Sequence, residues 1–327
     1  MYKTKSVFLL ITIMGSLITI FSNSWISMWM GLEMNMMAFI PLIKENKSKA
    51  TAEAMMIYFL IQSIGSALLM FSITVNYTFM ESWTLMPLIT FLALMIKMGA
   101  APFHMWMPEI MSKMKWNSCI MLMTWQKLAP MTMTMNLNPK SEVLTIMVMM
   151  SIIVGAIGGI NQTSLRKIMA YSSINHLGWM LSLIKIQSNW MMYLITYSMM
   201  VTSMCFMFNK YNMLFIPQIN SMNMSISEKM AYITSMMSLG GLPPFIGFMP
   251  KWIVIQSMVN SNMIFVSLIM IMFSLITLFY YIRTMSTLIM NQSMINKWIS
   301  SKSSKLIIMW MILLNFSLPM VYMVIFL

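Results

Sequence analysis

The sequence predicts an all-α protein that crosses a membrane many times. Hydrophobic residues make up 59% of its 327 positions and charged residues only 8%, whereas about a quarter of the residues in a soluble domain are charged. Apolar runs of roughly 20 residues, long enough to cross a bilayer as a helix, recur from one end of the chain to the other. We interpret the first run as a mature helix rather than a signal peptide, because a signal peptide would be one apolar segment before a soluble chain.

We expect about 11 transmembrane helices, bounded by charged residues, by Asn and Ser clusters or by proline. In chain order they cover residues 4–22, 24–43, 51–75, 84–112, 117–136, 141–161, 164–184, 187–208, 229–257, 261–283 and 304–326. The first ten form two five-helix repeats, at about 1–136 and 141–283, and a C-terminal helix at about 304–326 lies outside both. The whole chain, 1–327, is then a single membrane domain, and 209–228 is a solvated connection.

The loops alternate in positive charge, which orients the spans. Fifteen basic residues fall on one side: Lys3, Lys5, Lys44, Lys47, Lys49, Lys113, Lys115, Arg166, Lys167, Lys210, Lys229, Arg283, Lys297, Lys302 and Lys305. Lys140 and Lys185 fall on the other. The positive-inside rule places the N-terminus on the side of protein synthesis and the C-terminus on the opposite side. Because these charges are spread over short loops, the net charge of +13 does not indicate a nucleic-acid partner.

A repeated motif interrupts two of the predicted helices. "GAAPFHMWMPE" at Gly99–Glu109 and "GLPPFIGFMPK" at Gly241–Lys251 share Gly, Pro, Phe, Met and Pro at the same five positions. Proline removes a backbone donor, and unpaired backbone at membrane depth is tolerated only where it is buried in protein or lines a polar cavity. Matched broken helices in two halves are typical of transporters built from inverted repeats. An offset of five spans, an odd number, inverts the second repeat relative to the first.

Four lysine or glutamate side chains lie away from the ends of the predicted spans: Glu33, Lys97, Lys127 and Lys251. Such groups are costly in a bilayer and usually mark ion or proton routes. An apolar lining favours the neutral amine of a lysine and a nearby carboxylate favours the ammonium, so movement of Glu33 relative to Lys97 would change whether Lys97 holds its proton. Taken singly, each lysine could instead bind helix carbonyls or extend towards the membrane surface.

The histidines and cysteines predict no metal or haem site. His104 and His176 are expected to be hydrogen-bonded interior residues or minor members of a proton relay. Cys119 and Cys205 lie far apart in apolar runs with no CxxC spacing, which is typical of buried small hydrophobic residues. We therefore expect the chain to bind no metal and no cofactor.

Three motifs together, "KMGAAPFHMWMPE", "TWQKLAP" and "GLPPFIGFMPKW", resemble the antiporter-like subunits of respiratory complex I over essentially the whole chain. Methionine at 52 positions is typical of an AT-rich animal mitochondrial genome that reads ATA as Met, and indicates an arthropod. Bacterial members of the family begin with three further helices that this chain lacks.

The resemblance implies a function. By motif, the family's proton-relay roles fall on Glu33, Lys97, Lys127 and Lys251. The chain would be a core membrane-arm subunit of NADH:ubiquinone reductase, moving protons across the mitochondrial inner membrane while NADH, FMN, iron–sulfur clusters and ubiquinone react in other subunits. The implied partners are membrane-arm subunits on both flanks, accessory subunits and membrane lipids. The N-terminus would face the matrix and the C-terminus the intermembrane space.

Two other classes of function stay open at this point. One is a stand-alone cation/proton antiporter, because the fold resembles that class too. The other is a structural linker subunit without its own proton path, in which the buried charges are structural ion pairs. The matched broken helices argue against the linker, because a linker has no need of them.

Overall fold

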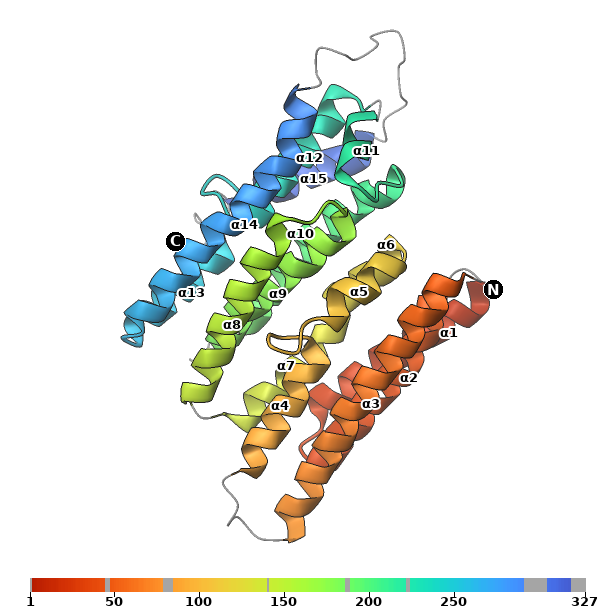
Figure 1. Cartoon of the computed structure of the whole chain (residues 1–327), viewed down its shortest axis with the longest axis vertical. Coiled ribbons are helices and arrows are strands. Elements are labelled where there is room, and N and C mark those ends of the chain that lie inside the picture. The colour runs from red at the N-terminus through yellow and green to blue at the C-terminus, as the bar shows by residue number, and fades with distance from the viewer. Residues whose placement is uncertain are drawn as a thin grey trace. The chain divides into compact units, whose positions relative to one another are not determined.

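The computed structural model describes residues 2–44, 48–78, 85–139, 141–185, 189–221, 224–290 and 305–318. Within these ranges the chain is helical apart from turns, short connections and an isolated β-bridge between Ser164 and Phe215, so the predicted all-α class is confirmed. The chain groups into two compact units, residues 1–151 (unit 1) and 152–327 (unit 2), with the boundary inside helix α8 (Figure 1).

Unit 1 is built from apolar helices that pack closely where their residues are small. The helices are α1 Tyr2–Phe21, α2 Trp25–Ile43, α3 Lys49–Thr78, α4 Met86–Met98, α5 Trp106–Lys113, α6 Trp116–Met123, α7 Trp125–Leu137 and the first half of α8 Ser141–Ile160. A Cβ placed on Gly31 of α2 would lie 2.7 Å from the backbone oxygen of Gly15 in α1. Glycine at this position therefore allows these two backbones to approach each other directly.

Unit 2 surrounds a helix that is buried along nearly its whole length. Its helices are the second half of α8, then α9 Leu165–Lys185, α10 Trp190–Lys210, α11 Ile216–Ser221, α12 Ile226–Gly240, α13 Phe248–Asn260, α14 Ile264–Met290 and α15 Lys305–Asn315. The buried helix is α9, which carries polar residues such as Ser172, Asn175 and His176 inside the unit. It therefore supplies the polar interior of unit 2.

Five of the described helices are long and apolar enough to span a membrane: α2, α3, α8, α10 and α14. The other predicted spans miss this criterion for identifiable reasons. Broken spans are divided into pieces that are too short, and α9 carries polar residues in the interior. The count of 11 spans therefore stays a prediction.

The structure adds local detail to one predicted span and to one predicted connection. The span predicted at 117–136 is divided at Thr124 into α6 and α7. The Thr124 hydroxyl donates to the Ile120 carbonyl at 2.8 Å, a side-chain bond that commonly bends helices. The connection 209–228 contains the short helix α11 and the start of α12.

Some predictions concern residues outside the described ranges. They are the loop charges Lys47, Lys140, Lys297 and Lys302 and the end of the last span beyond residue 318. The side chains of Lys3 and Lys305 are likewise not described.

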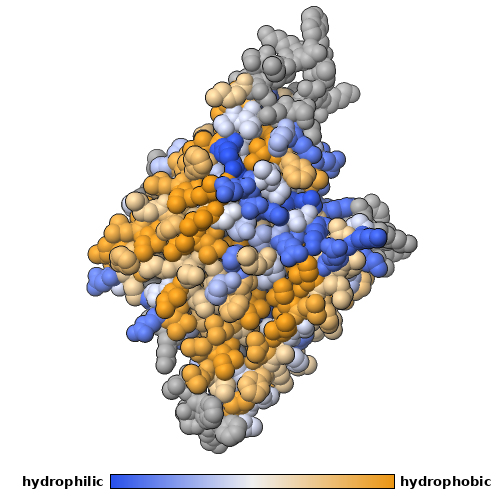
Figure 2. Space-filling view, in the orientation of Figure 1, coloured by the Kyte–Doolittle hydropathy of each residue, from blue (hydrophilic) through white to orange (hydrophobic). Residues whose placement is uncertain are grey.

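Large apolar side chains are exposed along the outer faces of the helices, as Figure 2 shows for one face. Examples are Leu10 on α1, Phe71 on α3, Leu275 on α14 and Leu313 on α15, each more than half exposed. Soluble monomers rarely expose large contiguous apolar patches, which mark membrane or protein contacts. These faces fit the hydrocarbon core of a bilayer.

Candidate functional site

The two helix breaks have the same backbone geometry. Each helix ends at a glycine in the left-handed region, Gly99 with φ 70° and Gly241 with φ 78°. In each break the glycine N–H donates to the carbonyl three residues earlier, at 3.2 Å and 2.9 Å respectively. The next N–H donates to the carbonyl five residues earlier, at 3.1 Å and 3.4 Å. This is a Schellman cap, and the helices resume at equivalent positions, Trp106 and Phe248.

Different partners bind the carbonyls at the end of each broken helix. At the first break, the side-chain amide of Gln62 on α3 donates to the Lys97 carbonyl at 3.1 Å. At the second, the Lys251 amino group donates to the Gly240 carbonyl at 2.7 Å. Carbonyls that have lost their helical donors are thus paired inside the protein, as membrane depth requires.

The last helix of the described chain also closes the second break. The Ile246 N–H donates to the Asn315 carbonyl at the end of α15, at 3.0 Å. The rings of Phe245 and Phe316 pack edge to face with centroids 5.4 Å apart. The helix predicted to lie outside the repeats therefore contributes directly to the break.

Glu33 and Lys97 form a loose ion pair in unit 1. The Lys97 Nζ lies 3.9 Å from a Glu33 carboxylate oxygen, with side-chain exposures of 2% and 22%. That separation is beyond hydrogen-bonding distance but within the range of strong charge interaction. Gly65 on α3 makes room for the lysine, because a Cβ there would lie 3.0 Å from the Lys97 Cγ. The sequence had predicted this pairing of residue types on α2 and α4.

Lys127 reaches the same interior as Lys97. Both lysines line one cavity of about 20 Å³ between α2, α3, α4, α5, α6 and α7, enough for one water molecule. Lys127 is 2% exposed and lies three residues after the bend at Thr124. Its position next to a helix bend was not predicted, and it means that all three intramembrane lysines lie within four residues of a break or bend.

Polar side chains that sequence reasoning missed line this cavity. The Tyr58 hydroxyl donates to the Gln126 side-chain oxygen at 3.3 Å, and the Gln126 amide donates to the Asn35 side-chain oxygen at 2.9 Å. Tyr58, Asn35 and Gln62 are buried. For Asn35, Gln62 and Gln126 a signal was present in the sequence, because amide residues within apolar spans need hydrogen-bond partners when buried.

Lys251 lies in the interior of unit 2. It is 5% exposed, and its Nζ lies 5.7 Å from the ring centroid of Trp179 on α9, as in a cation–π contact. A Cβ on Gly241 would lie 2.8 Å from the Lys251 Nζ, so glycine at this position also provides the space that the lysine occupies.

The two histidines differ in environment. His104 lies in the first break, with Nδ1 3.1 Å from the Pro102 carbonyl, and does not line the cavity that Lys97 and Lys127 share. His176 is buried on α9, and its Nδ1 lies 2.8 Å from the Tyr193 hydroxyl. Over the described residues, no three His, Cys, Asp or Glu side chains are grouped as metal ligands.

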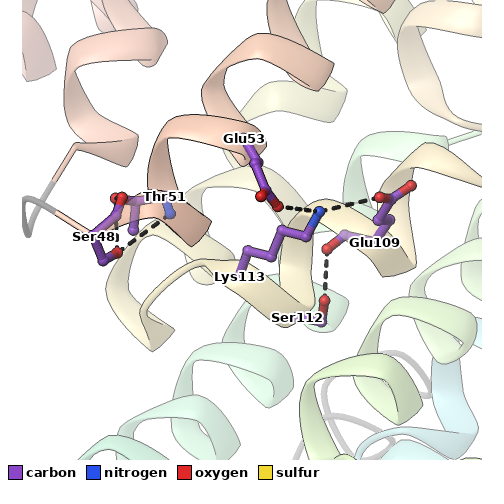
Figure 3. Close-up of polar contacts among 6 residues, drawn as sticks. All are labelled: Ser48, Thr51, Glu53, Glu109, Ser112 and Lys113. Carbon is purple, nitrogen blue, oxygen red and sulfur yellow. Dashed lines mark hydrogen bonds and ion pairs between the residues drawn. The ribbon is translucent and has the colours of Figure 1, made fainter.

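Another lysine of unit 1 is paired at the protein surface (Figure 3). The Lys113 Nζ lies 3.0 Å from a Glu53 oxygen and 3.1 Å from a Glu109 oxygen. Hydrogen bonds to Glu53 and then to Glu109 raise the pKa of Lys113 above its ordinary value. This cluster joins the start of α3 to the end of α5, and its two carboxylates are exposed.

The chain matches known proteins over most of its length. The family model described as "NADH:quinone oxidoreductase/Mrp antiporter, TM" matches residues 22–277. NADH-ubiquinone oxidoreductase chain 2 of Locusta migratoria is 45% identical over 312 residues, 93% of this chain and 91% of that protein. The protein of the same name from Anopheles gambiae is 40% identical over 305 residues, 90% and 89% of the two chains.

A solved structure has the same fold. A chain of respiratory complex I from Thermus thermophilus with bound aureothin superimposes with a TM-score of 0.81 at 18% identity, covering 94% of this chain and 75% of that one. The chain therefore belongs to the family of NADH-ubiquinone oxidoreductase chain 2.

Proposed function

We propose that this chain translocates protons as a core membrane-arm subunit of respiratory NADH:ubiquinone oxidoreductase, through Glu33, Lys97, Lys127 and Lys251. The observation that carries the assignment of residues is the shared cavity of unit 1. It is lined by Lys97, which is paired with Glu33, and by Lys127. Burying three ionisable groups together is costly unless they are paired or used.

The ion pair couples the position of Glu33 to the protonation of Lys97. At 3.9 Å and an effective dielectric constant of about 20, opposite unit charges attract by about 4 kcal/mol. Movement of Glu33 away from Lys97 removes that attraction and favours release of the lysine's proton. The proton then reaches Lys127 through the water-sized cavity and the polar groups of Asn35, Gln126 and Tyr58, and continues to Lys251 and outward.

The oxidation of NADH and the reduction of ubiquinone belong to other subunits of the complex, together with FMN and the iron–sulfur clusters. Conformational or electrostatic change reaches this chain from them. The proposed location is the mitochondrial inner membrane. The distribution of basic residues supports an N-terminus in the matrix and a C-terminus facing the intermembrane space.

Neighbouring membrane-arm subunits on both flanks, accessory subunits and lipids would cover the exposed apolar faces. Phe103 and Met105 of the first break are 38% and 71% exposed. In a bilayer, a break that is exposed to this extent needs a protein neighbour.

The decisive experiment compares Lys127→Ala with Lys113→Ala in the assembled complex, reconstituted in vesicles. We expect Lys127→Ala to lower the number of protons moved per NADH oxidised, and Lys113→Ala to leave it unchanged because Lys113 lies in the exposed surface cluster. An unchanged ratio in Lys127→Ala would make the relay assignment wrong.

The same variants distinguish the alternatives. If the chain were a structural linker, Lys127→Ala would reduce the amount of assembled complex in a native gel and leave the ratio of the remaining complex unchanged. If it were a stand-alone antiporter, the isolated chain in vesicles would exchange Na⁺ or K⁺ for protons.

A further inference from the structure

The charges of unit 2 are strongly unbalanced. Its sequence contains a single acidic residue, Glu228, and ten basic residues: Arg166, Lys167, Lys185, Lys210, Lys229, Lys251, Arg283, Lys297, Lys302 and Lys305. The Glu228 carboxylate accepts a hydrogen bond from the Lys210 amino group. The one carboxylate side chain of unit 2 is therefore already engaged, and negative charge for the other cations has to come from elsewhere.

Arg283 of α14 binds the connection between α8 and α9. Its Nη1 donates to the Ile160 carbonyl at the end of α8, and its Nη2 donates to the Gln162 carbonyl at 2.5 Å. A guanidinium has further N–H groups, and the Arg283 Nε has no hydrogen-bond partner among the residues that the structure describes. The two carbonyls bind the guanidinium but do not neutralise its charge.

Two further groups of the same connection favour an anion. The Ser164 hydroxyl, at the end of the connection, is buried and has no hydrogen-bond partner in the described part of the chain. Lys167 follows in the first turn of α9, which contains no acidic residue. The N-terminus of a helix carries partial positive charge, which disfavours a cation and favours an anion there. A bound anion would therefore stabilise this junction of α8, α9 and α14.

Exposed apolar side chains begin one helical turn from the junction. The helices α8 and α14 are in contact there, since a Cβ on Gly159 would lie 2.7 Å from the ring of Tyr280. Ile157 on α8 is 54% exposed and Phe279 on α14 is 58% exposed. These two residues precede Ile160 and Arg283, so they lie farther inside the predicted spans. A cation at the end of an exposed apolar face fits a phospholipid, whose phosphate lies at the membrane surface and whose acyl chains fill the core.

We propose that the junction of α8, α9 and α14 binds the phosphate group of an anionic phospholipid. The phosphate oxygens accept hydrogen bonds from the remaining N–H groups of Arg283, in the paired geometry that guanidinium and phosphate favour. The Ser164 hydroxyl and the Lys167 ammonium supply further contacts, and the acyl chains lie along Ile157 and Phe279. Basic pockets between transmembrane helices, on the side of the positively charged loops, are a recurrent type of site for such headgroups.

A carboxylate of a neighbouring subunit would also balance the charge of Arg283. The exposed apolar side chains favour the lipid, because an acyl chain needs such a face and a carboxylate side chain does not. Arg283 and Lys167 belong to no part of the proposed relay. The lipid site can therefore be tested without reference to proton translocation.

The test labels the assembled complex with photoreactive lipids in phosphatidylcholine nanodiscs. One preparation contains phosphatidylglycerol with a photoreactive acyl chain, the other phosphatidylcholine with the same chain, and mass spectrometry quantifies labelled peptides around Ile157 and Phe279. We expect the phosphatidylglycerol probe to label these peptides preferentially. Arg283→Gln and Lys167→Gln should each lower the preference about fivefold, the contribution of one basic residue at an anionic membrane surface. Lys113→Gln is the control and should leave it unchanged, because Lys113 is paired with two carboxylates.

Several results would overturn the lipid site. Equal labelling by the two probes is one, and a preference that survives both substitutions is another. Loss of the preference on addition of inorganic phosphate would assign the junction to free phosphate. A carboxyl-to-amine cross-link from Lys167 to another subunit, without lipid labelling, would assign it to a partner's carboxylate. Arg283→Gln also removes the two carbonyl contacts, so if that variant does not assemble, Lys167→Gln, which keeps them, decides the question.

Discussion

The amino group of Lys251 caps the helix that precedes its own, donating to the Gly240 carbonyl at 2.7 Å across the second break. A lysine of the proposed relay therefore also binds one end of a broken helix. The first break uses a neutral amide from Gln62 for the equivalent task. At the second break the residue proposed to carry the proton also binds the carbonyl, whereas at the first break another residue does so.

Replacing Lys251 by Met should destabilise the backbone of the second break. The substitution keeps the length of the side chain but leaves the Gly240 carbonyl without this donor, at a cost of about 1–3 kcal/mol. We expect faster amide hydrogen exchange at Gly241, Leu242 and Phe245 and a lowered proton ratio. Lys113→Met is the control, because its exposed ion pairs contribute less than about 1 kcal/mol. Unchanged exchange in Lys251→Met would contradict the capping role.

A methyl group added at Gly65 should displace Lys97. The Cβ would lie 3.0 Å from the Lys97 Cγ and 3.4 Å from the Ala93 carbonyl, so α3 and α4 must separate slightly. We expect Gly65→Ala to slow proton uptake several-fold while the complex still assembles. Gly240→Ala is the matched control, because the nearest atom to its Cβ is 3.5 Å away. Equal rates in the two variants would rule out the steric argument.

The amide at Gln126 should matter although it carries no charge. Gln126→Leu removes the group that links Tyr58 to Asn35 and leaves the buried Asn35 oxygen without this donor. A single unsatisfied buried group costs about 1–3 kcal/mol, and an apolar wall also disfavours water in the cavity. We expect slower proton uptake at an unchanged level of assembly. Gln126→Asn should be slow as well, because the shorter asparagine side chain cannot reach both Tyr58 and Asn35.

Glu228, at the start of α12, should make the stability of the fold depend on pH in the acidic range. Burial would raise the pKa of Glu228, but hydrogen bonds from Lys210, Tyr211 and Ser225 outweigh it and lower the pKa to about 2. Because its pKa is lowered in the folded state, the ionised Glu228 carboxyl stabilises the fold fully at pH values above the ordinary pKa of 4.5. This stabilisation is lost as the pH falls towards 2. Between pH 5 and 8 this carboxyl therefore contributes no pH dependence.

Thermal unfolding in lipid nanodiscs between pH 3 and 7 measures this effect. Glu228→Gln should destabilise the chain at pH 7, and the difference from the unsubstituted chain should shrink as the pH falls below about 4.5. Glu142→Gln is the control, since Glu142 is an exposed glutamate in the first turn of α8. A difference independent of pH would show that the charge of Glu228 is not what stabilises α12.

The features that were predicted correctly from the sequence depend on the chemistry of individual residues. Gly99 and Gly241 end helices because a left-handed residue favours glycine, and the prolines that follow prevent the helix from continuing. The pairing of Glu33 with Lys97 followed from the cost of burying either one alone. Each of these features depends on one residue type at one position in a predicted span.

What the sequence could not predict depends on contacts between distant segments. Gln126 binds Asn35 from 91 positions away, and nothing in either segment specifies that register. The bend at Thr124 arises from a side-chain hydrogen bond that a continuous apolar pattern conceals. His176 was correctly expected to be a hydrogen-bonded interior residue, but its tyrosine partner depends on how α10 packs on α9.

The contact of α15 with the second break has a consequence for how the chain is made. A ribosome completes Glu33, Lys97, Lys127 and Lys251 before it reaches Asn315, whose carbonyl accepts the Ile246 N–H. Until α15 is inserted, the nascent chain holds every ionisable group of the proposed relay but lacks the carbonyl that binds the Ile246 N–H beside Lys251. A stop codon between α14 and α15 would therefore give a product that contains all four residues of the proposed relay but lacks Asn315 and Phe316. In that product the Ile246 N–H and the Phe245 ring would lose these partners, and membrane quality control could recognise them.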